Sequence, residues 1–121
     1  MSRSGGITTV VLHEGRVVTA GVFGELDLYT AAGLGTVLAE CLDLRPACLI
    51  VDVSAVSFCD SSGLSALLQA AEAAAHAGTD FVLEGQKAPT LLRLLAVTGL
   101  DAVFGIRQQH GPASRPGPAA P

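Results

Sequence analysis

The chain has few cations, no long apolar run and no metal-binding spacing, and each of these absences excludes a class of function. Its 121 residues include only seven Lys and Arg against eleven Asp and Glu, for a net charge of −4. The seven cations are scattered along the chain, so they form no basic face that could neutralise phosphates. Nucleic acid is therefore not an expected partner.

Membrane and export signals are also missing. No window of eighteen consecutive apolar residues occurs, and residues 1–6 contain no charged region followed by an apolar signal core. We therefore expect a soluble, cytoplasmic protein that does not bind a membrane.

Cofactor and metal motifs are absent as well. Cys41, Cys48 and Cys59 have no CxxC spacing and lie among apolar residues, which predicts reduced structural thiols. The three histidines lie far apart without a second ligand type at metal spacing, so no metal site is expected. Neither a GxxxxGK[ST] nor a GxGxxG loop occurs, and we expect no cofactor.

The stretch FCDSSGLSALL at residues 58–68 organises the rest of the chain. Here an apolar run stops, a polar corner follows, and a helical pattern begins. Asp60 or Ser61 is a natural N-cap, because a short side-chain oxygen can accept a hydrogen bond from the free N–H groups of a helix's first turn. One face of the predicted helix consists of Leu64, Leu67, Leu68, Ala71 and Ala75, and the opposite face of Ser61, Ser65, Gln69, Glu72 and His76.

The segments before this corner predict a hairpin, a helix and a buried strand. Residues 7–12 and 17–23 are rich in β-branched residues and flank a Gly-containing turn, which predicts an antiparallel hairpin. Residues 24–30 are predicted to be a polar connecting loop that ends with Thr30 as a helix cap. Apolar residues recur at helical spacing over about residues 31–43, and residues 47–53 are typical of a central parallel strand.

Beyond the central helix, which is predicted to end near Gly78, the pattern alternates again. A short strand is expected at residues 80–83. A helix starts at Pro89 with Leu91, Leu92, Leu94 and Leu95 as its buried face, and an edge strand is expected within residues 100–106.

These elements predict a single α/β domain over residues 7–109. Its core is a mixed β-sheet of four to five strands packed by three to four helices. Residues 1–6 are predicted to be an N-terminal tail. Residues 110–121, rich in Pro, Gly and Ala, are predicted to be a disordered tail.

Four segments in this order resemble the STAS domain family, specifically the bacterial anti-sigma factor antagonists. They are GELD at 24–27, VDVS at 51–54, FCDSSGL at 58–64 and TGLDAVF at 98–104. The resemblance covers about residues 7–107, and its fold is the STAS-like α/β domain. The chain departs from the family's usual pattern at Ser65, where a second Gly is common, and at Cys59, where the residue is usually aliphatic.

The resemblance implies partner switching in transcription regulation, of the kind used in stress response and sporulation. In this family the first Ser of the motif is phosphorylated by a partner that is both an anti-sigma factor and a serine kinase, and a serine phosphatase reverses the modification. By position this residue is Ser61. The unphosphorylated chain is expected to bind the anti-sigma factor and release a sigma factor. The expected partner-binding residues are Glu25, Asp27, Asp60, Ser61, Ser62, Gly63, Ser65, Gln69 and Glu72.

Several residues keep a second interpretation. Ser61 could serve only as a helix cap, and Glu25 and Asp27 either contact a basic partner or form a solvated turn. A phosphate on Ser61 is expected to be tolerated by the free N–H groups at the helix start. We expect no catalytic residue and no enzyme, because there is no GxSxG elbow and no general base near the motif in sequence. The main functional alternative is a phosphorylation-independent STAS scaffold subunit of a transporter or signalling complex.

Overall fold

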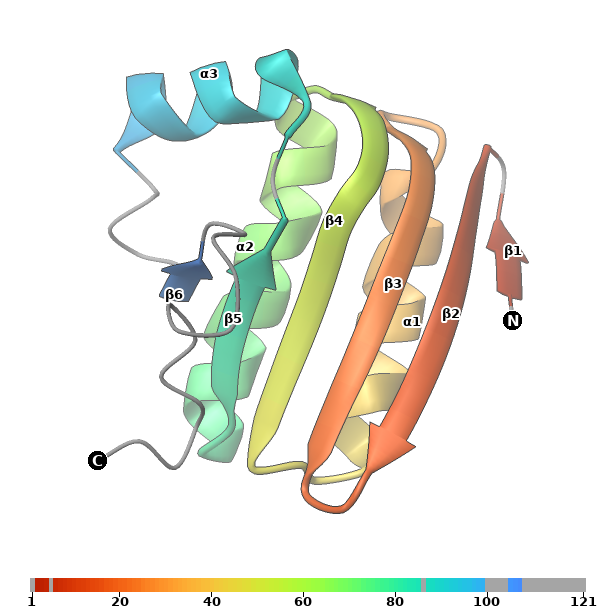
Figure 1. Ribbon diagram of the computed structural model, residues 1–121, viewed down its shortest axis with the longest axis vertical. Coiled ribbons are helices and arrows are strands. Elements are labelled where there is room, and N and C mark those ends of the chain that lie inside the picture. Colours follow the sequence, from red (N-terminus) through yellow and green to blue (C-terminus); the bar gives the residue numbers. More distant parts are fainter. Residues whose placement is uncertain (1, 5, 86, 100–104, 108–121) are drawn as a thin grey trace.

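The computed structural model describes residues 2–4, 6–85, 87–99 and 105–107, which form one mixed sheet and three helices (Figure 1). The strands are β1 (Ser2–Ser4), β2 (Ile7–Glu14), β3 (Val17–Leu26), β4 (Cys48–Cys59), β5 (Asp80–Glu84) and β6 (Gly105–Arg107). The helices are α1 (Ala31–Asp43), α2 (Ser61–Ala77) and α3 (Pro89–Thr98). None of the described helices is long and apolar enough to cross a membrane.

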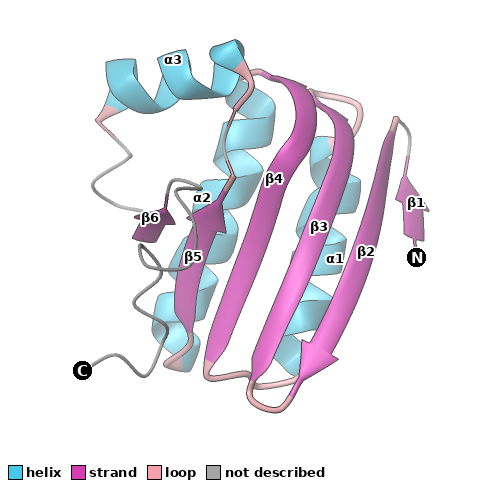
Figure 2. Cartoon of the chain, in the orientation of Figure 1, coloured by secondary structure: helices cyan, strands magenta, loops and turns pink. Residues whose placement is uncertain are grey.

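The spatial order of the strands follows their order in the chain. The β1–β2 and β2–β3 pairs are antiparallel, which confirms the predicted hairpin, and the β3–β4, β4–β5 and β5–β6 pairs are parallel. Successive crossovers advance across the sheet in one direction. Because such crossovers are right-handed, α1 and α2 lie on the same face of the sheet (Figure 2). Helix α3 lies instead across the end of the sheet where β4 stops.

The predicted α/β class and mixed sheet are confirmed, but the sheet has six strands instead of four to five. The additional strand is β1, which forms in the segment predicted to be an N-terminal tail and pairs Ser2 with Thr9. The edge strand predicted within residues 100–106 corresponds in part to β6, which spans Gly105–Arg107, while residues 100–104 lie outside the described residues. The predicted tail at residues 110–121 lies outside the described residues.

One hydrophobic core lies between the sheet and helices α1 and α2. Its fully buried side chains come from β2, β3, β4, β5 and the helices, and include Ile7, Val18, Val22, Leu34, Leu38, Leu49, Val51, Val53, Leu67, Leu83 and Leu91. In β4 the run from Cys48 to Val51 is buried throughout, as predicted for a central strand.

Strands β2 and β5 extend one or two residues beyond their predicted ends, and β3 and β4 extend further. Residues 24–26, which the sequence places in a connecting loop, complete β3, and β4 continues to Cys59. The register moves from Gly21↔Asp52 to Phe23↔Ala55, so β4 accommodates an extra residue in a bulge. A bulge lets polar residues interrupt the alternation without ending the strand, and this is why the prediction stopped too early.

The buried faces of α2 and α3 also differ from prediction. Leu64 and Leu67 are buried as expected, but Ala75 is exposed, and Leu68 and Ala71 are only half-buried. Ala66, Ala70 and Ala74 are buried instead, because α2 packs against α1 as well as against the sheet. In α3, Leu91 and Leu95 are buried, whereas Leu92 is 40% exposed.

Candidate functional site

The corner between β4 and α2 is closed by Asp60, which is the N-cap of α2. Its backbone is extended, and its Oδ1 accepts hydrogen bonds from the N–H groups of Ser62 at 2.9 Å and Gly63 at 3.2 Å. A carboxylate at this position satisfies two otherwise free donors and interacts favourably with the helix dipole. The alternative that Ser61 serves as the cap is therefore wrong.

Ser61 is the first residue of α2 and is exposed to solvent. Its hydroxyl makes no hydrogen bond with the described part of the chain. The expectation that a phosphate on Ser61 would find free N–H groups at the helix start needs correction, because the Asp60 carboxylate already occupies those of Ser62 and Gly63. Within the described part of the chain the Ser61 hydroxyl is thus free, whereas the N–H groups of Ser62 and Gly63 beside it are already bonded to the Asp60 carboxylate.

Gly63 brings α2 into close contact with the end of β3. A Cβ atom at this position would lie 2.6 Å from the Leu26 Cβ and 2.8 Å from the Leu26 carbonyl oxygen. That same oxygen accepts a hydrogen bond from the Asp60 N–H at 2.9 Å. Gly63 is buried, so it positions the neighbouring serines and offers no side chain to a partner.

The loop before α1 is held by its own side chains. Asp27 Oδ1 accepts hydrogen bonds from the N–H groups of Tyr29 at 2.9 Å and Thr30 at 3.1 Å. Thr30 Oγ1 donates to the Glu25 carbonyl at 2.8 Å and makes no capping bond to α1. These contacts favour the structural interpretation of Asp27. The Glu25 side chain is exposed.

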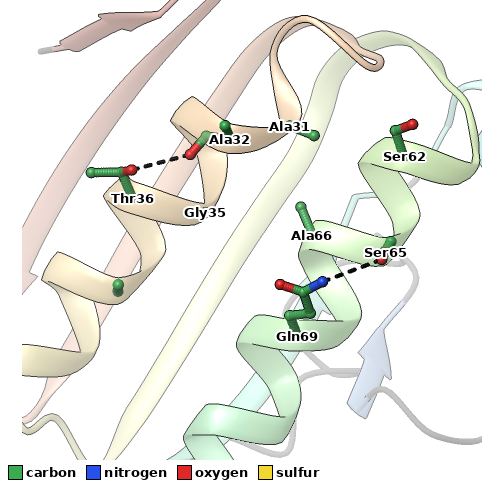
Figure 3. Close-up of a pocket in the computed structure, with 9 residues that line it drawn as sticks. Ala31, Ala32, Gly35, Thr36, Ser62, Ser65, Ala66 and Gln69 are labelled. Carbon is green, nitrogen blue, oxygen red and sulfur yellow. Dashed lines mark hydrogen bonds between the residues drawn. The ribbon is translucent and has the colours of Figure 1, made fainter.

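A groove of about 490 Å³ runs between α1 and α2, and we call it the α1–α2 groove (Figure 3). It is lined by Ala31, Ala32, Gly35, Thr36 and Ala39 of α1 and by Ser62, Ser65, Ala66 and Gln69 of α2. Nearly all of these side chains are small. Within it, Gln69 Nε2 donates to Ser65 Oγ at 3.5 Å. Three of the predicted partner-binding residues therefore line one depression, and Glu72 lies exposed one turn further along α2.

A second depression, the α2–α3 cavity, has a volume of about 400 Å³. It is lined by Cys59, Asp60, Ser61, Pro89, Thr90, Arg93 and Leu94. The Cys59 N–H donates to Thr90 Oγ1 at 2.9 Å and so ties α3 to the corner. The two serines of the motif thus line different depressions, Ser61 the α2–α3 cavity and Ser62 the α1–α2 groove.

Sequence reasoning missed Thr90 and Arg93. Their spacing places them on one face of a helix, but nothing in the sequence indicates that this face meets a corner some thirty residues earlier in the chain.

All three cysteines are free and buried, which confirms that they are structural thiols. Burial, together with the nearby Asp60 carboxylate, raises the pKa of Cys59 to about 12. Burial and Glu40 likewise raise the pKa of Cys41. Among the described residues, no group of three or more His, Cys, Asp and Glu could hold a metal ion.

The described histidines lie away from Ser61. His13 is in β2 next to the hairpin turn, at the opposite end of the sheet, and His76 is in the last turn of α2. Within the described ranges, no histidine is therefore placed to act as a general base for the Ser61 hydroxyl.

Comparison with known proteins gives concordant matches. A family model for the STAS domain matches residues 9–113. The anti-sigma-B factor antagonist of Listeria monocytogenes is 31% identical over 90 residues, covering 74% of this chain and 78% of the relative. Anti-sigma-F factor antagonist RsfB of Mycobacterium tuberculosis is 38% identical over 72 residues, or 60% of this chain, and the chain spans only 59% of that relative's length.

A solved structure agrees with these matches. The crystal structure of an anti-sigma factor antagonist from Mycobacterium paratuberculosis superposes with a TM-score of 0.74 at 32% identity, covering 83% of this chain and 84% of that chain. With a family model matching most of its length, the chain belongs to the STAS domain family, the family of these anti-sigma factor antagonists.

Proposed function

We propose that this chain is an anti-sigma factor antagonist that acts by partner switching. When unphosphorylated, it binds an anti-sigma factor with serine kinase activity and so releases a sigma factor. Phosphorylation at Ser61 switches this binding off, and a serine phosphatase restores it. The observation that carries the proposal is the exposed Ser61 hydroxyl, which makes no hydrogen bond with the residues that the structure describes, because Asp60 supplies the cap of α2. A sigma factor acts in transcription, so the proposed site of action is the cytoplasm.

The α1–α2 groove is the proposed docking surface for the anti-sigma factor. Its small side chains allow a partner's side chains to approach the helix backbones, and Ser62, Ser65 and Gln69 supply hydrogen-bond donors and acceptors. Ser65 belongs to this surface, so the family's more common glycine there would remove one of these polar groups. Of the two acidic residues in segment 24–27, Glu25 is the proposed contact, because the Asp27 carboxylate is used within its own loop.

Ser61 does not line the groove itself but adjoins Ser62, which does, so phosphorylation acts at the edge of the docking surface through charge and bulk. The kinase transfers the terminal phosphoryl group of ATP to Ser61 Oγ, the hydroxyl proton leaves to a base, and ADP is released. The new group carries roughly −1.5 to −2 charge at neutral pH and lies beside the Asp60 carboxylate. A loss of about 3 kcal/mol in binding free energy lowers affinity more than a hundredfold, which suffices for a switch.

The test is a pull-down from lysate of the source cells, with three baits and identification of the eluted proteins by mass spectrometry. The baits are wild type, Ser61→Asp and Ala75→Asp. Ala75 is exposed on α2, about 21 Å along the helix axis from Ser61, so Ala75→Asp is a control for added charge alone. We expect an ATP-binding serine kinase with wild type and Ala75→Asp, and not with Ser61→Asp.

Two follow-up results decide between the proposal and its rival. The recovered kinase should phosphorylate the wild-type chain at Ser61 when ATP is added, as read by peptide mass spectrometry. Recovery of the same partners, without a kinase, on all three baits would instead identify a phosphorylation-independent scaffold and contradict the proposal.

A further inference from the structure

We propose that Arg93 of α3 holds the phosphate of phosphorylated Ser61 across the α2–α3 cavity. The inference rests on the phosphorylation at Ser61 proposed above, and it adds α3 to the switch. A dianionic group attached to Ser61 would lie beside the like charge of Asp60, so a nearby cation or free hydrogen-bond donors would stabilise it.

The helix start cannot supply these donors. The N–H groups of Ser62 and Gly63 donate to Asp60 Oδ1, and the N–H of Leu64 donates to the Asp60 carbonyl at 3.0 Å. Only the N–H of Ser61 itself remains in the first turn of α2. A phosphate at this position therefore competes with a carboxylate that is already bound, and stabilisation by the protein, beyond that by water, would come from the other wall of the cavity.

That wall carries the required groups. Among the residues that the structure describes, the charged and titratable side chains lining the cavity are Cys59, Asp60 and Arg93, and Arg93 is the one cation of this set. Arg93 makes no hydrogen bond or ion pair with the described part of the chain. Its planar guanidinium is a cation that presents several N–H donors in a fork that matches two phosphate oxygens.

The position of Arg93 relative to Ser61 is fixed by the fold. Thr90 Oγ1 accepts the hydrogen bond of the Cys59 N–H, which anchors the first turn of α3 at the corner. Arg93 lies three residues further on, on the same face of α3, and lines the same cavity as Ser61. The Thr90 hydroxyl uses its oxygen as an acceptor for Cys59, so its hydrogen is available as a second donor to the phosphate.

The pairing has a measurable consequence, since a nearby cation favours the dianionic form of a phosphate. The test uses the full chain with phosphoserine incorporated at position 61 during translation, so that no kinase is needed. The phosphate pKa is measured by a ³¹P NMR pH titration in wild type, Arg93→Gln, Arg93→Lys and Arg16→Gln. Arg16 is exposed at the hairpin turn, at the far end of the sheet, so Arg16→Gln is a control for lost charge alone.

We expect a phosphate pKa about half a unit lower in wild type than in Arg93→Gln, the size typical of an exposed ion pair. Arg16→Gln should titrate like wild type, and Arg93→Lys should fall between wild type and Arg93→Gln. A pKa that is the same in wild type and Arg93→Gln, or that rises equally in Arg16→Gln, overturns the inference. Arg93 is exposed, so these variants should fold, which circular dichroism verifies.

The outcome is independent of partner binding. A lowered phosphate pKa in a phosphorylated chain that still binds its anti-sigma factor would contradict the proposed function and leave the pairing intact. An unchanged pKa in a chain that no longer binds would contradict the pairing alone.

Discussion

Replacing Gly63 with alanine tests whether the close approach of α2 to β3 sets the geometry of the corner. The added Cβ would lie 2.6 Å from the Leu26 Cβ and 2.8 Å from the Leu26 carbonyl oxygen. Non-bonded carbon atoms pack best at about 3.5–4.0 Å, so the first turn of α2 has to withdraw by roughly 1 Å. The Leu26 carbonyl is itself held by the Asp60 N–H, so it cannot rotate away without breaking that hydrogen bond.

The expected magnitude follows from two opposing effects. Overpacking a buried site costs about 1–3 kcal/mol. Alanine in place of glycine inside a helix gains at most about 1 kcal/mol. The clash here is with backbone atoms, so we expect the upper part of the first range and a net loss of about 2 kcal/mol. In a small domain this corresponds to a melting temperature lower by roughly 10 °C.

The assay is thermal and urea unfolding followed by circular dichroism, with Gly35→Ala as the matched control. Gly35 also lies inside a helix, but a Cβ there would meet no atom within 4 Å. The same substitution should therefore stabilise α1 by up to about 1 kcal/mol. If Gly63→Ala melts at or above the wild-type temperature, the contact with Leu26 does not require glycine, and the close approach of α2 to β3 does not set the geometry of the corner.

Two further predictions concern neighbours of Ser61. Asp60→Ala should lower the free energy of unfolding by about 1 kcal/mol through loss of the cap, whereas Ser61→Ala should stay within about 0.5 kcal/mol of wild type. Urea unfolding measures both values, and equal losses in the two variants would contradict the assignment of the cap to Asp60. Because burial raises the pKa of Cys59 to about 12 from the ordinary value of 9.0, iodoacetamide at pH 8 should modify Cys59 at least about a hundredfold more slowly in the native protein than in urea. Modification is read by peptide mass spectrometry, and rapid modification of Cys59 in the native protein would contradict this prediction. The native state binds the Cys59 proton more tightly than the unfolded state does, so the stability linked to this thiol is present below pH 9 and is lost as the pH rises towards 12.

The elements that sequence predicted well are those with strong local signals at both ends. Residues 31–43 match α1 at both bounds, because the apolar period is bracketed by Thr30 and Pro46. Gly78 and Gly99 have positive φ angles of 74° and 73°, and each ends its helix as a glycine at this position should. These signals act within a few residues and need no tertiary contact.

The errors occurred where distant contacts decide. The prediction ended β4 at residue 53, because the bulged region beyond it contains polar residues. At the first bulge of β4, Asp52 Oδ1 accepts a hydrogen bond from the Ser54 N–H at 2.9 Å. Likewise, the buried face of α2 turns towards Ala66 and Ala70 because α1 lies beside it. The spacing of apolar residues along a strand or helix does not indicate which other element packs against it.

For the site, sequence indicated which serine lies at the start of α2 but not its surroundings. Asp60 and Ser61 were equally plausible caps on chemistry alone, and only the backbone at the corner distinguishes them. The opposite wall of the cavity depends on the contact between Cys59 and Thr90, which are 31 residues apart. Contacts of this range follow from the assembled fold and not from local pattern.

The assignment of the cap to Asp60 has a consequence for how the proposed switch can work. A serine that capped α2 would exchange its hydroxyl oxygen for phosphate oxygens on phosphorylation, so each phosphorylation would rearrange the hydrogen bonds that hold the start of the helix. Ser61 makes no such bond, and the contacts that hold the corner come from Asp60, Gly63 and Leu26. Phosphorylation of Ser61 therefore changes the charge of the surface without removing a contact of the fold. A switch of this kind can alter partner affinity a hundredfold or more while leaving the stability of the domain almost unchanged.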